Sequence, residues 1–481
     1  MRSARASTPT TGDVDLRTAV ASLRGVDALT AAVGAVLTLA FAYEASLHGG
    51  TLSLGLIIGI GLFLGAVYAF LVVPHIAVAA TIPIFAFLPA AKIFVSPLLG
   101  PTKDVIGLAA ITAGIPLLAL RHRLGRARAA DRWLLIGVGL LVLLYVVNVA
   151  GRHNVAWAQG VRLASEPLLL LVAGLGLEQP RRTLRWAVTS LIVTGCVVAF
   201  YGLVQQVLGE WRLVSYGYSF SMQVRTIGGH LRSFGTLDEP FGYAAFLMLS
   251  LAALVFTARR TVLSVSAAML LLAGVATSYV RTAVLIAVAL VALDLARRRR
   301  VGAAVAVSAA VVAAAVAILV QAQGTQSRTY QSSSAVLTLN GRTSAWKTAL
   351  GSPTEWALGR GVGEVGTAAN RARYAITQSS QSQQKQLSSV DSGYLATVAD
   401  VGLVGLVVLL GLFGRAIALG RAAALRGESA GWLILALFTV VLIDALTRAS
   451  FTGFPSAFLA LLIVGLALAA ADEPRPSARS A

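Results

Sequence analysis

Long apolar stretches recur along the chain, separated by short connectors that carry most of its charged residues. Each stretch approaches the roughly 20 residues that cross a bilayer as a helix. The pattern therefore predicts an all-α polytopic membrane protein with about 12–14 transmembrane helices. The fourteen candidate spans are 29–46, 52–73, 76–95, 104–120, 133–151, 161–177, 186–207, 241–257, 262–279, 282–296, 301–320, 394–414, 431–449 and 453–471.

Arginine-rich connectors fall in every second gap between these spans. The basic clusters begin at Arg121, Arg181, Arg259, Arg297 and Arg415. Because positive connectors favour the cytoplasmic side, we expect both termini in the cytoplasm. Merging the least separated spans to give twelve leaves this orientation unchanged.

Two long connectors on the outer side divide the membrane helices into groups. The expected segments are a cytoplasmic tail (1–26), N-terminal membrane helices (27–208), an extracytoplasmic loop (209–240), central membrane helices (241–320), a large extracytoplasmic loop (321–392), C-terminal membrane helices (393–471) and a second cytoplasmic tail (472–481). Within the large loop, residues 342–350 predict a short amphipathic helix on the membrane face. We find no internal repeat, which disfavours an inverted-repeat transporter.

The composition agrees with the hydrophobic pattern. Hydrophobic residues make up 57% of the 481 residues and charged residues 12%, against about 45–50% and about 25% in soluble domains. A soluble enzyme, a secreted disulfide scaffold and a disordered regulator are thereby excluded. The net charge of +19 follows from the basic connectors, so nucleic acid is not an expected partner. No histidine has metal-ligand spacing with Cys, Asp or Glu, and we expect no metal or cofactor.

Three ionisable residues near span ends are candidates for chemistry. Arg281 lies at an outer turn between apolar spans, where it either reaches the lipid headgroups or binds an anion. Arg342 follows Gly341 and belongs either to an ordinary amphipathic turn or to a substrate cleft. Asp391 directly precedes a span, where Asp is both a good helix cap and a potential general base. The helix dipole would lower its pKa and weaken it as a base.

Other charged residues allow two interpretations each. The basic outer loop is either a solvated surface or a docking site for a polyanion, because arginine binds phosphate through two parallel hydrogen bonds. Asp444 and Arg448 are one helical turn apart and are expected to pair. Glu166 belongs either to a polar cavity or to an acid-driven transport path. The Gly359–Gly363 segment is only faintly similar to a phosphate-binding loop.

Four stretches, taken in order, resemble the O-antigen ligase and polymerase family of bacterial membrane glycosyltransferases. They are Arg232-Ser-Phe-Gly-Thr-Leu-Asp-Glu-Pro240, Ser278-Tyr-Val-Arg281, Gly341-Arg342 through Trp346 with the later Gly359–Gly363 segment, and Asp391-Ser-Gly-Tyr-Leu395 followed by Gly402-Leu-Val-Gly405. This sequence departs from the family pattern in three places. Two residues separate Ser278 from Arg281, Asp391-Ser392 replaces His-Asn, and Glu239 stands where Asn often precedes the proline.

The resemblance implies a GT-C-like fold in the bacterial plasma (inner) membrane and a metal-independent reaction on the outer face of that membrane. A glycan on a polyprenyl diphosphate carrier passes to a hydroxyl of a glycan or glycolipid acceptor, as ligase or polymerase. Arg281 and Arg342 would hold the diphosphate, and Asp391 would take the place of the histidine base. The substrate-binding residues would be Arg232, Arg360, Lys347 and Tyr394.

Two other classes of function stay open from the sequence. One is a transporter or flippase of a lipid-linked or anionic substrate, with Glu166 and Asp444 as coupling groups. The other is a catalytically inactive relative that scaffolds an envelope assembly, which the aspartate at position 391 allows. Besides its substrates, we expect the protein to contact the lipid bilayer and envelope assembly partners.

Overall fold

The computed structural model describes residues 50–96, 99–123, 129–149, 154–218, 226–227, 230–259, 261–298, 351, 353–364 and 392–473. The chain divides into two compact units, residues 1–65 and 66–481, and the packing below lies within the second. The expected spans 29–46 and 301–320, the first expected tail, residues 474–481 of the second, the amphipathic helix 342–350 and most of the loop 321–392 lie outside the described residues.

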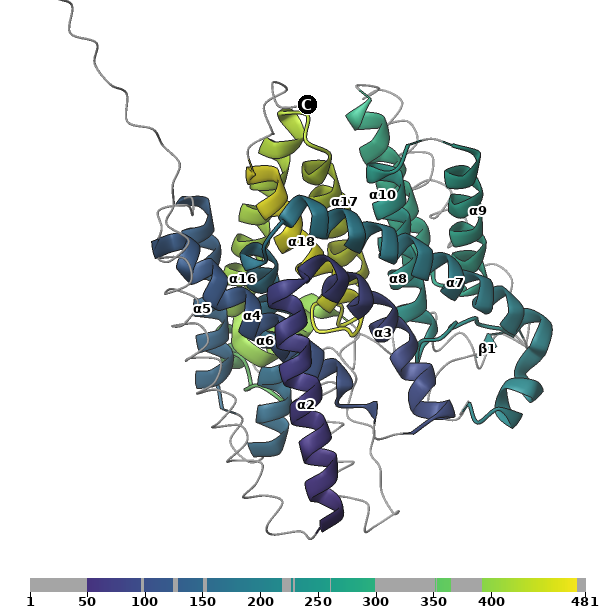
Figure 1. Cartoon of the computed structure of the whole chain (residues 1–481), viewed down its shortest axis with the longest axis horizontal. Coiled ribbons are helices and arrows are strands. Elements are labelled where there is room, and N and C mark those ends of the chain that lie inside the picture. The colour runs from purple at the N-terminus through teal and green to yellow at the C-terminus, as the bar shows by residue number, and fades with distance from the viewer. Residues whose placement is uncertain are drawn as a thin grey trace, which may run out of the picture. The chain divides into compact units, whose positions relative to one another are not determined.

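The described chain is helical throughout its apolar stretches (Figure 1). The helices are α2 (Gly50–Val72), α3 (Pro74–Phe94), α4 (Thr102–Arg123), α5 (Ala129–Val147), α6 (Asn154–Gly176), α7 (Pro180–Ser215), α8 (Pro240–Thr257), α9 (Val262–Thr277), α10 (Arg281–Arg297), α14 (Pro353–Leu358), α16 (Gly393–Leu425), α17 (Ser429–Asp444) and α18 (Ser456–Asp472). Strands β1 (Thr226–Ile227) and β2 (His230–Leu231) form one short antiparallel hairpin.

Six of these helices are long and apolar enough to cross a membrane, namely α3, α4, α6, α7, α8 and α16. Shorter apolar helices include α9, α17 and α18. The all-α polytopic membrane fold expected from the sequence is thereby confirmed. The orientation of the termini across the membrane stays a prediction.

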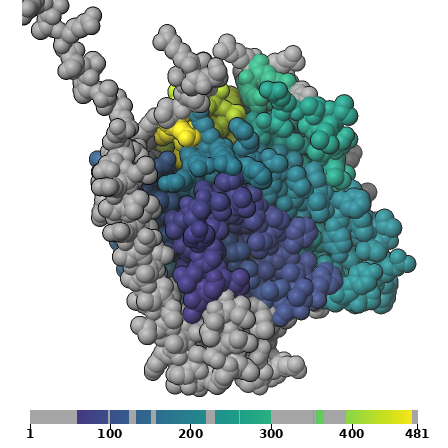
Figure 2. Space-filling model, in the orientation of Figure 1, coloured from purple at the N-terminus to yellow at the C-terminus, as the bar shows by residue number. Residues whose placement is uncertain are grey.

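The most buried part of the bundle is built from α8, α17 and α18. All but three residues of α8 are buried, and α17 packs against α8, α10, α16 and α18. By contrast α9 lies at one edge (Figures 1 and 2), where Val262 and Leu263 are exposed and only Leu271, Gly274 and Val275 are buried. Apolar side chains that face outward are expected where a helix contacts lipid.

Close helix contacts in this unit depend on small residues. Where α6 meets α18, a Cβ on Gly174 would lie 2.4 Å from the Leu462 carbonyl oxygen. A Cβ on Gly465 would lie 2.1 Å from the carbonyl oxygen of Leu171. The two backbones therefore touch directly, which is the usual way in which membrane helices gain packing contacts.

A glycine also breaks α16, near the end of its first third. Gly402 has φ 72°, and a Cβ there would lie 2.1 Å from the carbonyl oxygen of Ala357 at the end of α14. The chain after α14 therefore inserts at this break, where the Arg360 amide donates to the Ala399 carbonyl over 2.7 Å. The Gly359–Gly363 segment must pass between helices at this break. Its glycines provide the room that this passage requires.

Candidate functional site

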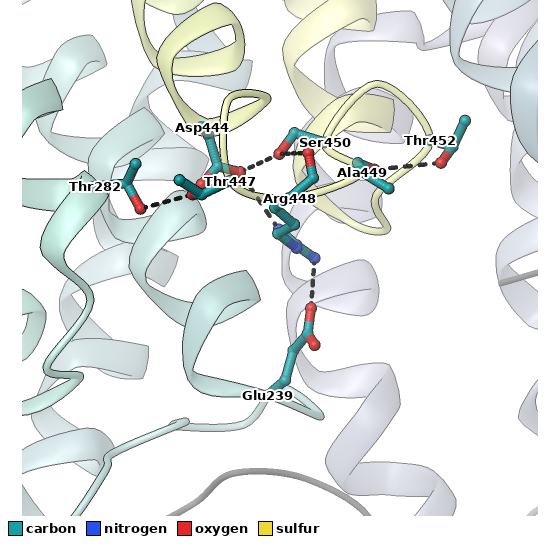
Figure 3. A network of polar contacts seen from close by, with 8 residues as sticks. All are labelled: Glu239, Thr282, Asp444, Thr447, Arg448, Ala449, Ser450 and Thr452. Atoms are coloured by element: carbon teal, nitrogen blue, oxygen red, sulfur yellow. Dashed lines mark hydrogen bonds and ion pairs between the residues drawn. The ribbon is translucent and has the colours of Figure 1, made fainter. Parts of the chain in front are cut away.

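The connector between α17 and α18, residues 445–455, carries an arginine held between two carboxylates (Figure 3). The Arg448 Nη2 atom lies 2.9 Å from Glu239 Oε1, directly before α8. Its Nη1 atom lies 3.6 Å from Asp444 Oδ2 at the end of α17, and the Ser450 hydroxyl donates to the same Asp444 oxygen. The expected pairing of Asp444 with Arg448 is confirmed, and Glu239 is an additional partner.

The same connector contacts the beginnings of two further helices. The Thr447 hydroxyl lies 3.0 Å from that of Thr282 in the first turn of α10. The Ala445 carbonyl accepts hydrogen bonds from the Gly393 amide (2.8 Å) and the Ser392 hydroxyl (3.2 Å) at the start of α16. The N-termini of α8, α10 and α16 are therefore all fixed to one short segment.

None of these three helices has a side-chain cap at its N-terminus. The side chains of the N-cap residues Glu239, Val280 and Ser392 accept no hydrogen bond from the first turn. The first amide groups of a helix lack partners within the helix and carry a partial positive charge. Three such ends on one connector make this part of the protein favourable for an anion.

Arg232 orders the turn between α9 and α10. Its Nε atom donates to the Ser278 carbonyl over 3.0 Å, and its guanidinium carbon lies 4.8 Å from the centre of the Phe241 ring. The Ser233 amide donates to the Thr277 carbonyl over 2.9 Å. Burial lowers the pKa of the Arg232 guanidinium to about 10, while the nearby Glu239 carboxylate opposes that shift.

Two glutamines of α7 hold the segment that contains Arg232. The Gln205 amide oxygen accepts from the backbone amides of Phe234 (3.1 Å) and Gly235 (2.9 Å), and its nitrogen donates to the Gly235 carbonyl. Gln206 donates to the Leu231 carbonyl over 3.0 Å. Neither glutamine was predicted from the sequence, although two adjacent amide side chains at the end of an apolar span could have indicated a polar contact there.

Arg281 differs from the other basic residues around this site. Lys92 pairs with Asp238 at 3.5 Å, Arg448 pairs with Glu239, and Arg232 is bonded to backbone. Arg281, the first residue of α10, is exposed and forms no ion pair or side-chain hydrogen bond with the residues described. Its charge is therefore not neutralised within this part of the chain.

The remaining expected site residues fall into three groups. The Tyr394 hydroxyl donates to the Leu442 carbonyl over 2.8 Å, and its ring packs edge-on against Phe451, which places Tyr394 beside the connector. Arg360 lies instead at the break in α16, near α5 and α6. Asp391, Arg342 and Lys347 lie outside the described residues, although Asp391 directly precedes Ser392 in sequence. Among residues that are described, no group of His, Cys, Asp and Glu is arranged to hold a metal.

Comparison with known proteins identifies one domain in the chain. Residues 244–410 match the family model described as O-antigen ligase. The match runs from the first turns of α8 into α16 and includes Arg281, Arg342, Arg360, Asp391 and Tyr394. It confirms the resemblance stated from the sequence motifs. No curated protein matches the chain.

Removing the arginine of the connector should destabilise the fold. In Arg448→Met the carboxylate of Asp444, which is 3% exposed, loses its cation, and breaking a buried pair in this way costs about 3–5 kcal/mol. We expect a markedly lower thermal unfolding midpoint for the purified protein in detergent, with partial recovery in Asp444→Asn/Arg448→Met. Arg426→Met, at the exposed end of α16, is the control and should unfold as the wild type does. An unchanged midpoint for Arg448→Met would contradict this role.

Proposed function

We propose that this chain, which carries an O-antigen ligase domain over residues 244–410, is a membrane glycosyltransferase of ligase or polymerase type. It transfers a glycan from a polyprenyl diphosphate carrier to an acceptor hydroxyl during assembly of a surface polysaccharide. The observation that supports this most directly is the unneutralised Arg281 beside three uncapped helix N-termini on one connector. A diphosphate is the anion that such a reaction brings to the site.

The chemistry requires positive charge where the carrier leaves. The bond between the anomeric carbon and the phosphate oxygen breaks, the acceptor oxygen bonds to that carbon, and the acceptor hydroxyl loses its proton. Negative charge therefore grows on the departing diphosphate. A fixed hydrogen-bond donor aimed at such charge increases the reaction rate roughly 10²–10³-fold in other enzymes. Arg281 and Arg342 supply this donation, and the helix ends add their partial charges.

Asp391 is the proposed acceptor of the proton. It precedes Ser392, the N-cap of α16, whose hydroxyl is bonded to the Ala445 carbonyl and makes no cap interaction. An aspartate next to a helix N-terminus is stabilised as the carboxylate, which keeps it charged but makes it a weaker base. Asp391 is thus a carboxylate just before a helix and, in this reaction, the base.

The proposed orientation places this chemistry outside the cytoplasm. In the topology with cytoplasmic termini, α8, α10 and α16 all begin on the extracytoplasmic side, and α17 ends there. The contacts of Glu239, Thr282 and Gly393 with one connector require the three helix beginnings to lie on the same side. The packing and the charge rule thus agree.

Loss of the Arg281 charge should abolish transfer. In cells that lack the chromosomal copy, Arg281→Ala should leave glycan on the carrier and reduce the transferred product at least about 100-fold, the effect of losing one such donor. Arg281→Lys should retain a small fraction of product, because it keeps the charge without the planar fork. Arg426→Ala is the matched control. Near-normal product in Arg281→Ala, at equal protein in the membrane, would remove this residue from the site.

The role of Asp391 is tested by two substitutions. Asp391→Asn keeps the size and polarity of the side chain but cannot take a proton, so we expect a correctly inserted, thermally stable protein whose transfer rate falls at least about 100-fold. Asp391→His should retain activity, because imidazole is a competent base. Transfer rates come from the release of carrier diphosphate by the purified proteins. Full activity in Asp391→Asn would exclude this residue as the base.

A further inference from the structure

Four charged side chains of α4 and α6 lie together. The Lys103 Nζ atom is 2.9 Å from Asp104 Oδ1, and the Arg162 Nη1 atom is 3.2 Å from Asp104 Oδ2. Glu166 follows Arg162 by one helical turn and points at α4. Charged residues in membrane helices are costly and mark functional sites by default. The reaction derived above uses none of the four.

Glu166 has unused hydrogen-bonding capacity. It is 3% exposed, and within the described part of the chain neither carboxylate oxygen has a hydrogen-bond donor. Its Oε1 atom lies against α4, where a Cβ on Gly107 would be 2.1 Å away, so glycine provides the space for the carboxylate. The hydroxyl of Ser165 is also buried without a partner among these residues. Buried acceptors without donors are unfavourable, which points to an occupant that donates.

The cluster adjoins the same connector that holds the proposed transfer site. The Lys103 Nζ atom lies 5.3 Å from the ring centres of both Phe454 and Phe458. Phe454 belongs to the connector, six residues after Arg448. Both α4 and α6 begin on the extracytoplasmic side in the proposed topology, as α8, α10 and α16 do. The charged cluster and the three helix ends are thus neighbours of one segment on the same side.

The charges of the cluster indicate what it binds. The formal charges of the two cations and two carboxylates sum to zero, so a neutral ligand leaves this charge balance unchanged. A metal cation would meet Lys103 and Arg162, and a diphosphate would meet Glu166 and Asp104. A sugar hydroxyl donates to a carboxylate and accepts from an ammonium or guanidinium group. The exposed fraction of the side chain falls from 41% at Arg162 to 16% at Asp104 and 10% at Lys103, so Arg162 is the most accessible of these three.

We infer that this cluster binds hydroxyl groups of the acceptor glycan, with Glu166 as its most deeply buried member. The inference rests on the proposed transferase function, since it assigns the second substrate of that reaction. The donor diphosphate then lies at the helix ends beside Arg281, and the acceptor lies across the connector beside Lys103. Both carboxylates of the cluster act as binding groups here, and neither takes the proton of the reacting hydroxyl.

The first test separates the two substrates kinetically. The donor is purified carrier-linked glycan, and the acceptor probe is the glycan and glycolipid fraction extracted from cells that lack this protein. Glu166→Gln and Arg162→Gln should raise the KM for the acceptor fraction about tenfold or more, the effect of losing a charged hydrogen bond, while the KM for the donor stays within twofold. Glu178→Gln, just beyond the opposite end of α6, is the control. Unchanged acceptor KM values in both variants would overturn the inference and leave the transferase function standing.

The second test requires no catalysis. Dicyclohexylcarbodiimide modifies buried carboxyl groups in membrane proteins, and mass spectrometry of the wild-type protein measures the fraction modified at Glu166. The acceptor fraction should protect Glu166 at least fivefold, whereas inorganic diphosphate should not. Protection by diphosphate alone, or by neither probe, would overturn the inference. If the wild type transfers no glycan but the acceptor fraction still protects Glu166, the binding site stands and the proposed transfer reaction fails.

Discussion

The ion pairs of Arg448 are the interaction on which the rest of the site depends. This side chain joins the end of α17 to the residue before α8, and the segment that carries it also bonds to the first turn of α10 and the start of α16. Three helices that are distant in sequence thereby present their N-termini to one place. The arrangement concentrates positive partial charge without using Arg448 itself as a free cation, because two carboxylates neutralise it.

This division of roles explains the different surroundings of the arginines. Arg448 and Arg232 are held inside the protein by carboxylates, backbone carbonyls and an aromatic ring. Arg281 follows the turn that Arg232 fixes through Ser278 and remains exposed at the head of α10. A buried arginine that is held by ion pairs or hydrogen bonds determines geometry, whereas an exposed one with no partner among the described residues is available to a phosphate group. The family match covers Arg281 but ends before Arg448 and begins after Arg232 and Glu239.

The sequence predicted the helices well, because apolar length alone is decisive in a membrane protein. It also predicted the pairing of Asp444 with Arg448, which depends only on helical spacing. It did not reveal that Glu239 is a second partner of Arg448, since Glu239 lies 209 positions earlier in the sequence and no local pattern links these residues. The break at Gly402 was likewise missed, because the reason for it is the close approach of α14 from elsewhere in the chain. Contacts that depend on tertiary packing required the structure.

The most direct test of the transferase account is the glycan attached to the polyprenyl carrier in cells that lack this protein. The account predicts that glycan accumulates on the carrier and disappears from it when the gene is restored. Long stranded chains would identify a ligase, because polymerisation had already taken place, and single repeat units would identify a polymerase. A carrier-linked pool that is unchanged in amount and chain length would contradict the account.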